Sequence, residues 1–156
     1  MALFGNTFGK KPTGIHLKSK LSELVKIQFS TMMLVENTPA LVDFAQKAFM
    51  EGEIEFLKYV ETYRTLSDSN ERGQLGRKIF NDYIAHGAKR QANVSGQEIK
   101  DIQAGLSGAS SKLFDKAYQQ VRSTVVGQIL DSNSNKHWVA ALKKVKLCPV
   151  CKACGY

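Results

Sequence analysis

From residue 19 onward, hydrophobic side chains recur at three- and four-residue spacings, the period of an amphipathic helix. Successive apolar stripes are separated by polar or glycine-containing segments; they cover residues 21–33, 41–49, 54–63, 75–84, 99–106, 113–129 and 138–142. No segment alternates with a period of two for more than a few residues, and the chain has only three prolines. The pattern predicts an all-α bundle of about seven helices, whose short connections make neighbouring helices antiparallel.

Polar residues indicate where some of these helices begin and end. Ser95 and Glu98 are three apart, the spacing of a capping box at a helix start. Residues rich in Ser, Asp, Asn and Gly predict a loop over 65–73 and a turn over 131–135. Between these two segments, the longest helix is expected from about Ser111 to Leu130.

Length and composition indicate one soluble domain. The chain has 156 residues, of which 43% are hydrophobic and 23% are charged, as in ordinary globular proteins. No apolar run approaches the roughly 20 residues that cross a bilayer. The start of the chain has no extended apolar segment of the kind found in a signal peptide. We therefore expect a cytoplasmic protein.

The positive charge is concentrated at the two ends. The net charge of the chain is +8. Four lysines lie in residues 1–20 and five in residues 136–156, and neither segment contains an acidic residue. The remaining residues, 21–135, carry 13 basic and 14 acidic side chains. Basic ends on a nearly neutral centre favour an anionic membrane surface over nucleic acid as a partner. We predict a flexible basic leader (1–18), a helical domain (19–145) and a Cys-rich tail (146–156).

No motif for catalysis or cofactor binding is found along the sequence. The three histidines lie far apart, and no nucleophile is paired with a base. Glu51, Glu53 and Glu55 are two residues apart, so they do not face one another on a helix. Their charges instead favour a helix N-terminus. The composition thus predicts a binding module with no catalytic residue and no cofactor.

Four segments resemble, in the right order, motifs of the regulator of G-protein signalling (RGS) family. The first is Phe44 followed after nine residues by Ile54-Glu55-Phe56-Leu57, and then by Glu61 and Tyr63; the others are Lys78–Ile84, Phe114–Ala117 and Asn133–Trp138. Together they cover roughly residues 36–142. The resemblance implies an RGS-like fold, in which an antiparallel four-helix bundle is joined to a terminal helical subdomain.

The resemblance also implies a function and a partner. A divergent RGS domain is expected to bind the switch regions of a GTP-bound heterotrimeric G-protein α subunit (Gα) and to accelerate GTP hydrolysis. It supplies no catalytic arginine, because Gα carries one in cis. It would act by binding the transition-state arrangement of the switches more tightly than the ground state.

Carried over residue by residue, the family's Gα contacts fall on loops at one end of the bundle. Asn93 matches the family Asn that approaches the Gα glutamine. The full set of expected contacts is Glu51, Gly52, Glu53, Asn93, Ser95, Ile129, Asn133, Ser134 and His137.

This sequence departs from the family pattern at several of these contacts. Gly52-Glu53 stands where the family usually has Glu-Asn, Asn133 replaces an Asp, and His137 replaces an Arg. The span from Phe114 to Asn133 is also longer than usual. These departures leave an alternative open, an RGS-like interaction or scaffold module, tethered to a membrane, that does not accelerate hydrolysis.

The C-terminal tail contains three cysteines at equal spacing, Cys148, Cys151 and Cys154. Three thiolates are one short of the four ligands of a structural zinc site. Cysteines that follow closely on Lys143, Lys144 and Lys146 also suit palmitoylation beside a polybasic patch, which would place the protein at the inner face of the plasma membrane. An unmodified tail is the third alternative.

Overall fold

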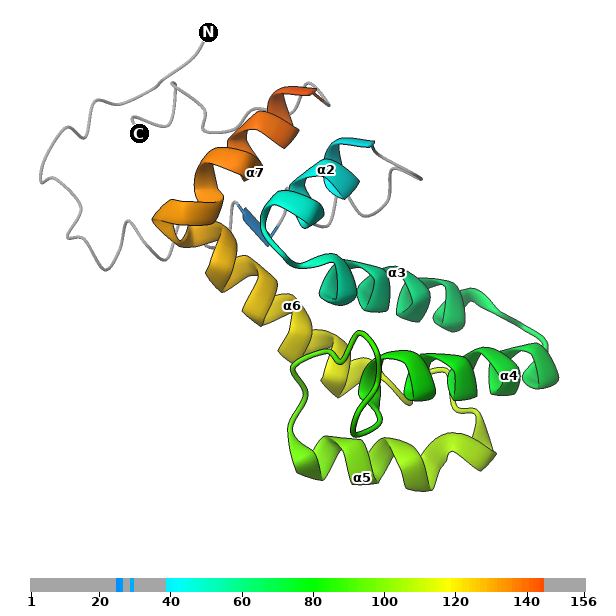
Figure 1. Ribbon diagram of the computed structural model, residues 1–156. Helices are drawn as coiled ribbons and strands as arrows, with labels where there is room; N and C mark the ends of the chain where they lie inside the picture. Colours follow the sequence, from blue (N-terminus) through cyan, green and yellow to red (C-terminus); the bar gives the residue numbers. More distant parts are fainter. Residues whose placement is uncertain (1–24, 27–28, 30–38, 145–156) are drawn as a thin grey trace, which may run out of the picture.

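The computed structural model describes residues 25–26, 29 and 39–144 (Figure 1). The predicted leader and Cys-rich tail, including Cys148, Cys151 and Cys154, lie outside the described residues, so the division of the chain into three parts stays a prediction. Among the residues that are described, no helix is both long and apolar enough to cross a membrane.

The described part of the chain consists of helices and contains no strand, which confirms the predicted all-α class. The α-helices are α2 (Pro39–Lys47), α3 (Glu51–Thr65), α4 (Ser69–Ile79), α5 (Gly96–Gly105), α6 (Asp115–Leu130) and α7 (Ser132–Lys144). Two short elements extend them: a π-helical turn, η1 (Phe80–Ile84), continues α4, and a 3₁₀ turn, η2 (Leu106–Gly108), continues α5.

The helices form two connected parts. In Figure 1, α3 and α4 lie antiparallel, α5 lies on the far side of α4, and the long α6 crosses from this group to α7. Helix α3 packs on both α4 and α6, whereas α2 and α7 pack on each other at the other end of α6. This arrangement agrees with a helical bundle that carries a terminal subdomain.

Buried aromatic rings pack against one another within each of these two parts. In the terminal subdomain, the Trp138 ring lies 5.0 Å from the Phe44 ring, edge to face, and 6.1 Å from the Phe29 ring. In the bundle, the Phe114 ring meets the Tyr63 ring at 5.0 Å and 87°. Such edge-to-face pairs stabilise the packing beyond the burial of their area.

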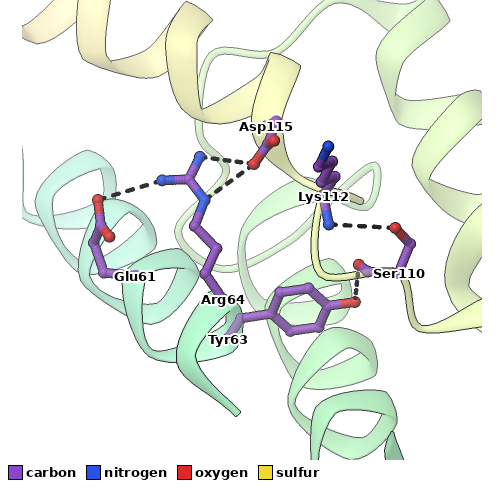
Figure 2. A network of polar contacts seen from close by, with 6 residues as sticks. All are labelled: Glu61, Tyr63, Arg64, Ser110, Lys112 and Asp115. Atoms are coloured by element: carbon purple, nitrogen blue, oxygen red, sulfur yellow. Dashed lines mark hydrogen bonds and ion pairs between the residues drawn. The ribbon is translucent and has the colours of Figure 1, made fainter. Parts of the chain in front are cut away.

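A polar network holds the C-terminal end of α3 against the N-terminal end of α6. Figure 2 shows the Arg64 guanidinium between Glu61 and Asp115, with two hydrogen bonds of 2.8 and 3.0 Å to one Asp115 oxygen. The Tyr63 hydroxyl donates to the Ser110 carbonyl at 2.8 Å. Because α3 and α6 are antiparallel, the start of α3 and the end of α6 lie together at the opposite end of the bundle.

The predicted loop over 65–73 is wrong in its second half, because α4 begins at Ser69. The Asp68 carboxylate caps the helix by accepting 2.8 Å hydrogen bonds from two backbone N–H groups of the first turn. Gly73, the one glycine in that predicted loop, is buried inside the helix. At Gly76 an added Cβ would stand only 3.1 Å from the Tyr63 ring, so close packing accounts for the missing side chain.

Two other predicted boundaries shift by a few residues. The residues from Ser111 to Phe114 form turns, and α6 begins at Asp115. The predicted turn over 131–135 is shorter, because α7 already begins at Ser132, where the Asp131 carbonyl accepts two backbone hydrogen bonds of its first turn. The predicted cap at Ser95 is confirmed: its hydroxyl accepts from the Glu98 N–H at 3.3 Å.

Candidate functional site

The described residues contain no group of three or more His, Cys, Asp or Glu side chains placed to hold a metal ion. The expected contact residues instead lie in three connecting segments: the α2–α3 junction, the loop between η1 and α5, and the α6–α7 junction. Figure 1 shows all three at the same side of the bundle, opposite the α3–α4 turn. We call them together the contact end.

The α2–α3 junction presents an aromatic side chain to solvent. Helix α2 ends at Lys47, and Phe49 adopts a left-handed backbone conformation with φ of 55°. Its side chain is 90% exposed, whereas that of its neighbour Met50 is buried. The periodicity had placed Phe49 in a core stripe, and that placement is wrong because the helix ends two residues earlier.

The start of α3 touches the loop between η1 and α5. Glu51 is exposed, and Gly52 and Glu53 are half-buried in the first turn. A Cβ added to Gly52 would lie 3.2 Å from the Arg90 carbonyl oxygen and 3.4 Å from the Arg90 Cβ. The glycine that departs from the family pattern thus allows the loop backbone to approach α3.

Asn93 is exposed in a loop that is anchored on both sides. Before it, Ala92 is buried and its N–H donates to the Tyr83 carbonyl at 2.8 Å. After it, the Ser95 N–H donates to the Gln120 side chain at 3.1 Å, which ties the loop to α6. Ser95 itself is exposed and begins α5. A polar side chain therefore projects from a backbone with little freedom.

The α6–α7 junction is less open than the sequence suggested. Ile129 is 0% exposed, so its side chain is not available for the apolar contact that the resemblance implied. Its carbonyl accepts a 3.2 Å hydrogen bond from the Asn135 side-chain amide, which closes the junction. Asn133 lies in the first turn of α7, where Ser134 and, one turn on, His137 are half-buried.

A charged network lies beside the contact end. Arg90 forms an ion pair with one oxygen of Glu55, and the Tyr83 hydroxyl donates to the other oxygen at 2.9 Å. Burial, and then the hydrogen bond and charge of Glu55, raise the pKa of Tyr83 above its ordinary value, so the hydroxyl stays protonated. Lys78 and Asp82 form a second ion pair nearby.

An open cleft of about 580 Å³ surrounds this network. It lies over α3, the end of α4 with η1, and the following loop; its lining residues are Glu55, Lys58, Tyr59, Thr62, Lys78, Asp82, Tyr83, Lys89 and Arg90. Four cations and two carboxylates line it, and both carboxylates are already paired. The cleft thus has an excess of positive charge.

The described residues therefore form an all-α bundle whose expected contact residues lie in three connecting segments. The family model described as "Regulator of G protein signaling domain" matches residues 17–132, well over half of the chain, and the chain belongs to this family. No curated protein matches the chain.

Family membership confirms the predicted RGS resemblance and its all-α fold. Members of the family are regulators of G-protein signalling, and their domains bind Gα subunits. The match ends at residue 132, so Ser134 and His137 lie beyond it. Phe49 lies within it, and its exposure was not predicted from the sequence, because only the position of the helix end reveals it.

Proposed function

We propose that this chain binds the switch regions of GTP-bound Gα through its contact end and accelerates GTP hydrolysis there. The observation that supports this most is the convergence of the three connecting segments. Gly52 lies directly against the loop that presents Asn93, and the antiparallel pairing of α3 with α6 brings the α6–α7 junction to the same end. A single partner surface can therefore contact all three.

The chemistry of the contact end suits a stabilising role. The Asn93 amide can both donate and accept hydrogen bonds, as the side chain of a water-orienting glutamine on Gα requires. Its backbone is anchored on both sides, so little conformational freedom is lost on binding. Preorganised polar groups act most strongly on a transition state, since they need no rearrangement as the charge develops.

The other exposed residues would supply affinity. Phe49 offers an exposed apolar side chain in the α2–α3 junction, close in sequence to the negative charges of Glu51 and Glu53. Burial of one aromatic side chain at an interface contributes a large share of binding free energy. In this proposal the chain has no catalytic residue and no cofactor of its own, and the chemistry stays with Gα.

State-selective binding tests this proposal. Purified Gα would be prepared with GDP, with a non-hydrolysable GTP analogue, and with GDP and aluminium fluoride, which mimics the transferring phosphoryl group. We expect the tightest binding to the aluminium fluoride state, and we expect Asn93→Ala to lose that preference. Equal affinity for the GDP and aluminium fluoride states would contradict the proposal.

Two observations favour a second candidate, a scaffold module that binds without accelerating hydrolysis. Ile129 is buried, and Gly52-Glu53 supplies a carboxylate where the family usually presents an amide. A scaffold would bind Gα with no preference among the three nucleotide states. The same titration therefore separates the two candidates.

A further inference from the structure

One carboxylate ties three elements together beside the contact end. Glu55 lies in the second turn of α3, Arg90 lies in the loop between η1 and α5, and Tyr83 lies in η1. Glu55 Oε1 pairs with the Arg90 guanidinium, and Glu55 Oε2 accepts a 2.9 Å hydrogen bond from the Tyr83 hydroxyl. Both oxygens of the carboxylate are therefore engaged, one by the loop and one by the helix that leads into it.

The same loop is held by its backbone at the residues next to this contact. The Arg90 N–H donates to the Asp82 carbonyl at 3.4 Å, and the Ala92 N–H donates to the Tyr83 carbonyl at 2.8 Å. The acceptor carbonyls belong to η1, where the Ala85 N–H reaches back to Phe80 in the wider π-helical pattern. The Arg90 side chain thus fixes the loop three residues before Asn93.

We propose that Glu55 is a positioning residue, which holds Arg90 and thereby the loop that presents Asn93 to Gα. This inference rests on the proposed function for its consequence, although the clamp itself is a property of the free chain. Glu55 does not need to touch the partner. Its effect passes through Arg90 and the anchored backbone to Asn93.

The exposure of the pair predicts a local effect rather than a global one. The Arg90 side chain is 51% exposed and that of Glu55 is 39% exposed. Ion pairs this exposed contribute little to overall stability, because solvent screens them. Loss of the pair should therefore leave the melting temperature nearly unchanged and loosen only the loop, which distinguishes a positioning role from a structural one.

The cleft provides a matched control. Lys78 and Asp82 form an ion pair with side-chain exposures of 53% and 45%, but this pair joins α4 to η1, whereas the Glu55–Arg90 pair joins α3 to the loop. Lys78→Gln removes a pair of similar exposure from the same cleft. It should change neither the hydrogen exchange of the loop nor the rate of GTP hydrolysis by Gα.

The first arm of the test needs no partner. Hydrogen exchange of the Ala92 amide would be compared in the unaltered chain and in Glu55→Gln, Arg90→Met, Arg90→Lys and Lys78→Gln. We expect exchange to be at least about fivefold faster in Glu55→Gln and Arg90→Met, because the hydrogen bond to Tyr83 opens more often. Arg90→Lys keeps the positive charge, so the Ala92 amide in this variant should retain most of its protection from exchange. Unchanged exchange in Glu55→Gln would overturn the inference.

The second arm measures single-turnover GTP hydrolysis by Gα at saturating chain. Glu55→Gln should lower the accelerated rate at least about fivefold, and it should cause no further loss in an Asn93→Ala background, since the two residues act through one contact. Additive losses would overturn the route through Asn93. If the unaltered chain does not accelerate hydrolysis, the proposed function is wrong, and the exchange measurement still decides whether Glu55 holds the loop.

Discussion

Replacement of Phe49 should raise stability and lower partner affinity at the same time. The residue has φ of 55°, a left-handed conformation that costs a residue with a Cβ about 1–2 kcal/mol. Glycine removes that strain, but it also increases the conformational entropy of the unfolded chain, which lowers stability by about 0.4–1 kcal/mol. Since the side chain is 90% exposed, almost no burial is lost. Phe49→Gly should therefore be more stable by about 0.5–1 kcal/mol, or roughly 1–4 °C in Tm.

Phe49→Ala separates strain from side-chain loss. Alanine keeps the Cβ and so keeps most of the strain, and its stability should stay within about 0.5 kcal/mol of the unaltered chain. Both variants lose the aromatic ring. If Gα buries that ring, each should bind about 2 kcal/mol more weakly, which is roughly a 30-fold rise in Kd.

Urea denaturation gives the stability, and calorimetric titration against Gα with GDP and aluminium fluoride gives the affinity. Val42→Ala is the control, because Val42 is the other large apolar residue exposed among those described, at 46%, and lies on α2 away from the junction. It should leave affinity unchanged. A less stable Phe49→Gly would refute the strain argument, and an unchanged Kd in both variants would remove Phe49 from the contact end.

Three further predictions concern packing, pH and the tail. Gly76→Ala should lower the free energy of unfolding by about 1 kcal/mol in urea denaturation, because its Cβ would press on the buried Tyr63 ring. Gly127→Ala, with open space around it, should raise that free energy by about 0.5–1 kcal/mol. Equal effects of the two substitutions would contradict this packing. The raised pKa of Tyr83 keeps its hydroxyl protonated in the folded chain, so the free energy of unfolding should fall as pH rises above 10.0, where the unfolded chain loses that proton. Tyr83→Phe should show a smaller fall between pH 9 and pH 11, and an equal fall would show that Tyr83 is not responsible. For the tail, we propose palmitoylation of Cys148, Cys151 and Cys154, backed by the basic patch. Intact mass spectrometry of the chain from its native cells should show an added lipid mass that hydroxylamine removes. Zinc bound in stoichiometric amount would exclude palmitoylation.

Periodicity was enough to predict the helices, because the apolar stripes match the buried faces of most of them. It failed where tertiary contacts override local signals. Gly73 counted toward the predicted loop over 65–73, yet it is buried inside α4, where an added Cβ would lie 3.8 Å from the Ala109 Cβ. Phe49 continues the apolar stripe of α2, yet the chain turns before it and the ring faces solvent.

The contact residues could be proposed only through the family resemblance, and their exposure could not be deduced from it. Asn93 is exposed on an anchored loop, whereas Ile129, carried over by the same reasoning, is buried because α7 begins directly after α6. The pair of Glu55 and Arg90 joins residues far apart in the sequence. No local pattern predicts it, since it forms only when the loop folds back on α3.

Single-turnover GTP hydrolysis by a panel of purified Gα subunits tests the central claim most directly. Each Gα would be measured alone, with the unaltered chain, and with Asn93→Ala. The proposed function predicts acceleration of at least one Gα and a loss of about tenfold or more of that acceleration in Asn93→Ala, because a contact made in the transition state is removed. A folded, helical chain that accelerates none of the panel would contradict it and leave the scaffold module as the function of this RGS domain.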